Sequence, residues 1–133
     1  MRVVPGKGRR VTSRSTWPIE KKSMMVNEYK LSSMNQYSPT EVMKHDVTSG
    51  ECFKSFLLNL LPGQEVPAHT HLHKCVLLFP QTGSGTLFTE DKEELVIESG
   101  SIYTDHIGCN FGLRNTGNAP LQVLVILVSA PAD

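Results

Sequence analysis

From residue 51 onward, short apolar segments alternate with turn signals, and this pattern limits the possible folds more than any other feature. Apolar or alternating runs cover 52–60, 75–79, 86–89, 94–98 and 121–128, and they are separated by turn residues such as Gly83-Ser84-Gly85 and Ser99-Gly100. Runs of this length, bounded by Gly, Asn and Pro, are typical of β-strands. About seven or eight strands with little helix predict an all-β sandwich or barrel.

One segment predicts a helix. Ser38-Pro39-Thr40-Glu41 has the form of a capping box with proline at the first helical position. A short helix is therefore expected from there to about His45, before the strands begin.

Length and cysteine content point to one domain in a reducing compartment. The chain has 133 residues, of which 39% are hydrophobic, enough to bury a core. Cys52, Cys75 and Cys109 cannot all pair internally and show no CxxC spacing, so we expect free thiols and a cytoplasmic location. The longest apolar run, 123–128, is far shorter than the ~20 residues of a membrane-spanning helix, so we expect no membrane partner.

The charges are distributed unevenly along a chain of zero net charge. Residues 1–22 contain seven Lys/Arg and one acid, Glu20, whereas the remainder contains six basic and twelve acidic residues. A basic arm over 1–24, followed by one domain over 25–133, is the expected organisation. Because the arm lacks interleaved aromatic residues, nucleic acid is not expected as a partner. An interpretation as an over-long or tag-derived N-terminus also stays open.

Three of the five histidines stand at alternate positions: His69, His71 and His73. In an extended segment, side chains at such spacing leave the same face of a sheet. Neutral imidazole nitrogens that converge on one point suit zinc, iron, copper or nickel. The run therefore predicts part of a metal site, although an isolated His-x-His is often no more than a polar strand face.

Two segments of the sequence resemble the two motifs of the cupin superfamily. In the first, Gly63 is followed by His69, His71 and, after the next strand, Gly83. The second runs from Gly100 through Gly108 to Arg114-Asn115-Thr116-Gly117. The resemblance covers roughly residues 51 to 130 and implies a single jelly-roll barrel, commonly a homodimer. Fold does not by itself identify a reaction.

The resemblance also implies a ligand set, which this chain retains only in part. It makes His69 and His71 metal ligands, but the family's glutamate falls at Cys75 or Val76, and its second histidine falls at Phe111. Cys75 is the candidate third ligand because a thiolate binds zinc or iron tightly, and an apolar core position is the alternative for it. Phe111 is expected in the cavity wall.

Further polar residues near these motifs are weaker candidates. His73 and His106 could serve as metal ligands, although a hydrogen-bonding or rim role fits His73 better. His106 and Tyr103 could supply an acid or a base at the cavity mouth.

Two classes of function follow from these residues. One is an enzyme of the dioxygenase, decarboxylase or isomerase type that uses Fe, Zn, Cu, Ni or Mn on a small organic molecule. The other is a non-catalytic cupin that binds a small molecule or a metal, with a sensing or structural role. Whether the chain is an enzyme stays open at this point.

Overall fold

The computed structural model describes residues 1–13, 24–70, 73–105, 108 and 110–129. These residues are nearly all β, with one turn of 3-10 helix, η1, at Leu31–Ser33. The strands, in chain order, are β1 (Arg2–Val4), β2 (Arg9–Ser13), β3 (Met24–Glu28), β4 (Met43–Ser49), β5 (Phe53–Leu60), β6 (Glu65–His69), β7 (Lys74–Thr82), β8 (Ser84–Thr89), β9 (Glu94–Glu98), β10 (Tyr103–Asp105), β11 (Phe111–Arg114) and β12 (Leu121–Ser129).

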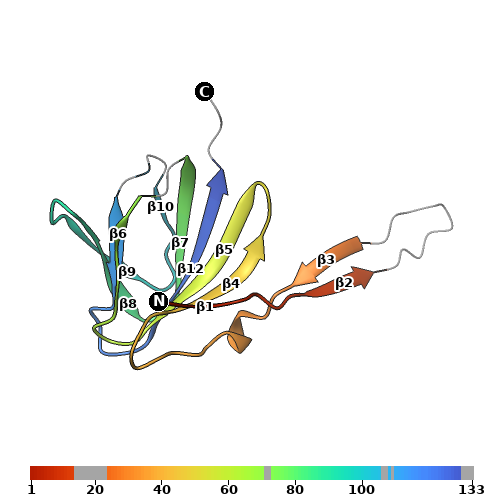
Figure 1. Ribbon diagram of the computed structural model, residues 1–133, viewed down its shortest axis with the longest axis horizontal. Helices are drawn as coiled ribbons and strands as arrows, with labels where there is room; N and C mark the ends of the chain where they lie inside the picture. The colour runs from red at the N-terminus through yellow and green to blue at the C-terminus, as the bar shows by residue number, and fades with distance from the viewer. Residues whose placement is uncertain (14–23, 71–72, 106–107, 109, 130–133) are drawn as a thin grey trace.

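Two sheets form the barrel, and Figure 1 shows them facing each other. The larger sheet has six strands in the order β1-β4-β5-β12-β7-β10, and the smaller has four in the order β6-β11-β8-β9. Strand β1 joins β4 in parallel, with Arg2 opposite Met43, whereas the other pairings are antiparallel. The two sheets are formed by strands that alternate between them along the chain, as in a jelly roll.

The main core lies between the sheets and follows from side-chain alternation. On β5, Phe56, Leu58 and Leu60 belong to this core, and they are matched by Val123 and Val125 on the neighbouring β12. Because successive side chains point to opposite faces, the residues between them lie on the outer face of the large sheet.

That outer face is also covered, so β5 is buried on both sides. Leu57 packs there with Met34 and Val47 in a second cluster, beneath the segment that contains η1. Asn59 on the same face donates hydrogen bonds of 2.9 Å from Nδ2 to the carbonyl oxygens of Met34 and Gln36. A strand buried on both faces reads as a continuous apolar run, which explains the composition of 52–60.

The all-β prediction is confirmed, but the helix predicted from Ser38 to about His45 is wrong. Residues 43–49 are strand β4, in which His45 is buried and its Nε2 donates to the Gln36 carbonyl oxygen at 3.2 Å. The Ser38 hydroxyl does accept a hydrogen bond from the Thr40 amide, at 3.3 Å, but no helix follows. Pairing of β4 with β5 outweighs the local capping signal.

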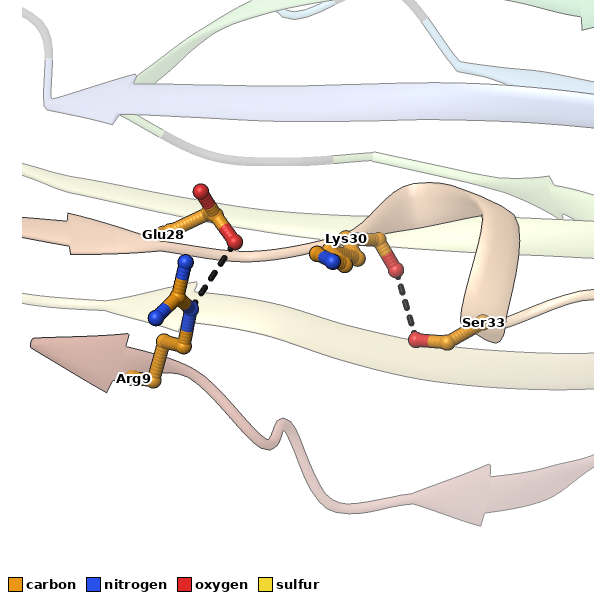
Figure 2. A network of polar contacts seen from close by, with 4 residues as sticks. All are labelled: Arg9, Glu28, Lys30 and Ser33. Carbon is orange, nitrogen blue, oxygen red and sulfur yellow. Dashed lines mark hydrogen bonds and ion pairs between the residues drawn. The ribbon is translucent and has the colours of Figure 1, made fainter. Parts of the chain in front are cut away.

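Strands β2 and β3 form a separate two-stranded hairpin that extends sideways from the barrel (Figure 1). Arg9 pairs with Glu28 across it, with 3.0 Å between Nε and Oε1, and the Ser33 hydroxyl donates to the Lys30 carbonyl oxygen just beyond β3 (Figure 2). The sequence predicts that the N-terminal arm ends at position 24. In the structure, β3 begins at this position and pairs with β2 of the predicted arm.

Candidate functional site

A cavity of about 270 Å³ lies inside the barrel, and we call it the barrel cavity. Residues from both sheets line it: Met1, Lys44, Lys54, Phe56, Leu58, Val66, His69, Val76, Leu78, Leu87, Phe111, Gly112, Leu113, Val125 and Leu127. Most of these side chains are apolar. The described charged residues among them are Lys44 and Lys54, and His69 is a further polar one.

His69 reaches the barrel cavity from the end of β6, opposite Phe111 on β11. Its Nδ1 lies 2.9 Å from the Pro67 carbonyl oxygen. Because a carbonyl oxygen only accepts, Nδ1 must carry the proton, and in the neutral ring the lone pair then belongs to Nε2. This is the tautomer of a histidine that coordinates through Nε2.

Two lysines on the large sheet also face the barrel cavity. The Lys44 ammonium lies 4.4 Å from the centre of the Phe56 ring and 3.9 Å from Asp46 Oδ1. Its side chain is only 17% exposed. Burial lowers the pKa of Lys44, and so do the charge of Lys54 and a side-chain hydrogen bond with it, whereas Asp46 acts in the opposite direction.

The sequence singled out neither lysine, although alternation could have found Lys54. It stands two and four residues before Phe56 and Leu58, which are core residues on the inner face. Lys44 stands two residues after Val42, another core residue. A lysine in a strand is usually exposed to solvent, so its charge predicts the outer face even where the alternation predicts the inner face.

Cys75 does not share the face of His69. His73, which is exposed, has a left-handed backbone with φ of 59°, so the chain turns between β6 and β7. On β7, Val76 lines the barrel cavity, and Cys75, next to it, therefore leaves the opposite face. A common face for His69 and Cys75 would require one uninterrupted strand through position 73. The placement of Cys75 argues against coordination together with His69.

The other predicted site residues are partly outside the described part of the chain. His71, His106 and Cys109 lie outside the described residues. Phe111 lines the barrel cavity and packs against the main core. Tyr103 lies on β10, and its hydroxyl oxygen accepts a hydrogen bond from the Glu98 amide at 3.1 Å.

Tyr103 lines a second space, the side hollow, of about 440 Å³. Acidic residues stand at this hollow, among them Glu93, Glu94 and Asp105. Four apolar walls are common to both spaces: Val76, Leu78, Leu87 and Phe111. The two spaces are therefore adjacent, and the side hollow carries the acidic residues whereas the barrel cavity carries the lysines.

Among the residues that the structure describes, no three His, Cys, Asp or Glu side chains gather in a possible metal site. His69 has the tautomer that a metal ligand needs, but a catalytic zinc site typically uses three protein ligands. Lys44 and Lys54, on the same cavity, would repel a cation. The described donors alone therefore do not fit a metal ion.

Motif glycines and the motif asparagine have structural explanations. Gly83 has φ of 78°, and a Cβ there would lie 2.4 Å from the Pro120 carbonyl oxygen. Asn115 is 1% exposed, donates from Nδ2 to the Leu60 and Ala119 carbonyl oxygens, and accepts from the Gly117 amide. Both residues hold turns of the barrel.

Within the described residues, no helix is long and apolar enough to cross a membrane. Cys52 and Cys75 are free thiols.

Solved structures with the same architecture cover most of the chain, although no family model and no curated protein match it. TT1209 from Thermus thermophilus is 26% identical, with a TM-score of 0.69 over 78% of this chain and 98% of that one. A protein from Klebsiella pneumoniae described as having a double-stranded β-helix domain is 18% identical, with a TM-score of 0.72 over 80% and 92%. The cupin domain of Cnp3 from Schizosaccharomyces pombe is 13% identical, with a TM-score of 0.70 over 91% and 88%. This chain therefore has the double-stranded β-helix fold of the cupin superfamily, which the two motifs in its sequence predict.

Proposed function

We propose that this chain binds a small organic molecule in the barrel cavity. The observation that carries this proposal is the cavity itself, which is lined by apolar side chains of both sheets and by few polar groups. Its volume of about 270 Å³ is near the lower end of the range for ligand sites, about 300–1,000 Å³. Apolar walls with a few convergent polar groups are the usual composition of such sites.

A cavity-filling substitution tests the proposal. Leu127 lines the barrel cavity from β12, and the adjacent Ile126 leaves the opposite face of the strand. We expect wild-type protein to bind naphthamide, an uncharged aromatic probe, in isothermal titration calorimetry. Leu127→Phe should abolish this binding, and the matched control Ile126→Phe should keep it. Equal binding by both variants would show that the cavity is not the ligand site.

A metal site at His69 and His71 is the second candidate function. The observation that favours it is the hydrogen bond from His69 Nδ1 to the Pro67 carbonyl oxygen, which selects the tautomer that a histidine has when it coordinates a metal through Nε2. The sequence proposes four further ligands: His71, His73, Cys75 and His106. Of these, Cys75 is disfavoured because it leaves the opposite face of β7 from the cavity. If bound, the metal would act as a Lewis acid on the small molecule, with Tyr103 or His106 as candidate proton donors.

Metal analysis of protein purified without an affinity tag tests this second candidate. Stoichiometric Fe, Zn, Cu, Ni or Mn that disappears in both His69→Ala and His71→Ala would support it. Metal-free protein from several growth media would remove it and leave the non-catalytic binding function.

A further inference from the structure

We propose that the ligand of the barrel cavity is an organic anion whose carboxylate binds between Lys44 and Lys54 and whose apolar part lies against the remaining walls. This inference rests on the proposed binding function and specifies the class of ligand. It arises from two basic side chains that meet on one apolar cavity.

Both lysines reach the cavity from neighbouring strands of the large sheet. Lys44 stands on β4 opposite Leu58, and Lys54 stands at the start of β5. The Lys44 side chain extends along the sheet, because its ammonium lies over the ring of Phe56, which is two residues from Lys54. The two ammonium groups therefore approach each other on the inner face.

Among the described residues, Asp46 forms an ion pair with Lys44, so the two positive charges at this place are only partly balanced. Asp46 is the carboxylate near Lys44, at 3.9 Å, beyond hydrogen-bond distance. Burial and the proximity of Lys54 both disfavour the state in which the two lysines are charged, and both lower the pKa of Lys44. A carboxylate between them would accept a hydrogen bond from each and neutralise the repulsion.

The rest of the cavity favours an organic ligand over an inorganic anion. Leu58, Leu78, Val125 and Phe111 are among the walls, and they offer no hydrogen bonds. A carbon skeleton would displace water from these surfaces and gain hydrophobic free energy, which phosphate or sulfate would not. The acidic residues Glu93, Glu94 and Asp105 line the side hollow and not the barrel cavity, so they do not compete for the lysines.

Two probes of nearly equal size and different charge test the inference. Naphthoate carries a carboxylate, and naphthamide replaces it with an uncharged amide. In isothermal titration calorimetry, we expect wild-type protein to bind naphthoate more tightly than naphthamide. Lys44→Met and Lys54→Met should each weaken naphthoate binding at least about tenfold, since a hydrogen bond to a charged group is lost. Neither variant should weaken naphthamide binding.

Controls separate this effect from general charge loss and from misfolding. Lys30→Met removes the same charge from an exposed loop position, outside the cavity lining, and should leave both affinities unchanged. Circular dichroism melting checks that each variant is folded, and Lys44→Arg, which retains the charge, should retain most of the naphthoate binding.

Distinct outcomes would overturn the two proposals. If both probes bind wild type equally, or if the lysine variants bind naphthoate as wild type does, the anion assignment is wrong and cavity binding survives. If inorganic phosphate binds as tightly as naphthoate, the organic assignment is wrong. If neither probe binds, the proposed function fails, and this inference fails with it.

Discussion

At the scale of single residues, the barrel cavity contains a charged side chain that is costly to bury, Lys44. Lys44 is 17% exposed and stands between the aromatic ring of Phe56 and the like charge of Lys54. The folded chain holds this proton more weakly than the unfolded chain, so stability linked to Lys44 rises as the pH increases from the folded pKa to the ordinary value of 10.5. The cost of the charged form is present in full below that window.

Neighbouring substitutions should move the pKa of Lys44 in opposite directions. Lys54→Met removes the charge repulsion and the hydrogen bond that lower the pKa, so it should rise. Asp46→Asn removes the attraction that raises it, so the pKa should fall further. The chemical shift of the Lys44 Cε, followed by NMR against pH, measures both changes. An unchanged value in both variants would mean that the three charges do not interact.

Asn115 is expected to be a stability residue. Asn115→Ala leaves the Leu60 carbonyl oxygen, the Ala119 carbonyl oxygen and the Gly117 amide without this partner. Each buried group so orphaned costs about 1–3 kcal/mol, and urea unfolding should show a loss of roughly 3 kcal/mol in total. Asn118, exposed in the same turn, gives the matched control, and Asn118→Ala should lower the free energy of unfolding by less than about 0.5 kcal/mol. Equal losses would contradict the role of Asn115.

Only part of the site could be predicted from the sequence at this scale. The spacing of His69 draws attention to a residue that lines the cavity, and the motif comparison does the same for Phe111. Lys44 and Lys54 were not predicted as cavity residues, because a charged side chain in a strand is expected on the solvent face. The turn that separates the faces of Cys75 and His69 is not evident in the sequence, because His73 has a left-handed backbone at a position where no glycine marks it.

At the scale of elements, strands with a clear alternation or a continuous apolar run were predictable. The segment 94–98 coincides with β9, and 52–60 and 121–128 differ from β5 and β12 only at their ends. The predicted helix failed because three residues of β4, Met43, His45 and Val47, are buried on one face, and their burial depends on β5 and on the segment above them. A local signal could not report that tertiary pairing.

The contact between β11 and β6 should not tolerate a side chain at Gly112. A Cβ there would lie 2.5 Å from the Val66 carbonyl oxygen and 2.7 Å from the Ala68 amide nitrogen, both backbone atoms of β6. Gly112→Ala should therefore displace β6 together with His69, and lower the free energy of unfolding by about 1–3 kcal/mol. Denaturant unfolding measures the loss.

Gly50 provides the control for this substitution. A Cβ at Gly50 would meet the Phe53 carbonyl oxygen at 3.5 Å, an ordinary contact. Gly50→Ala should be close to neutral, and an equal effect of both substitutions would contradict the close approach of β11 to β6.

At the scale of the whole molecule, stability is expected to be unevenly distributed. Strands β5 and β12 pair along their full length at the centre of the six-stranded sheet, whereas β2 and β3 pair only with each other. An isolated two-stranded hairpin is marginal in water. The ion pair Arg9–Glu28 is exposed, so it adds little.

Hydrogen exchange followed by mass spectrometry should reveal this difference. We expect amides of β2 and β3 to exchange quickly, and those of β5 and β12 to exchange slowest. Protection of the hairpin equal to that of β5 would contradict this expectation and would show that the hairpin is covered.

Homodimerisation, which the cupin resemblance implies, remains a prediction, and sedimentation velocity tests it by giving the mass in solution.

Phe111 is one of four side chains that line both the barrel cavity and the side hollow, together with Val76, Leu78 and Leu87. Because a protein interior is close-packed, enlarging one of these shared walls removes room from both spaces at once. A larger side chain at a shared wall therefore differs in its consequence from one at Tyr103, which lines only the side hollow, or at Lys54, which lines only the barrel cavity.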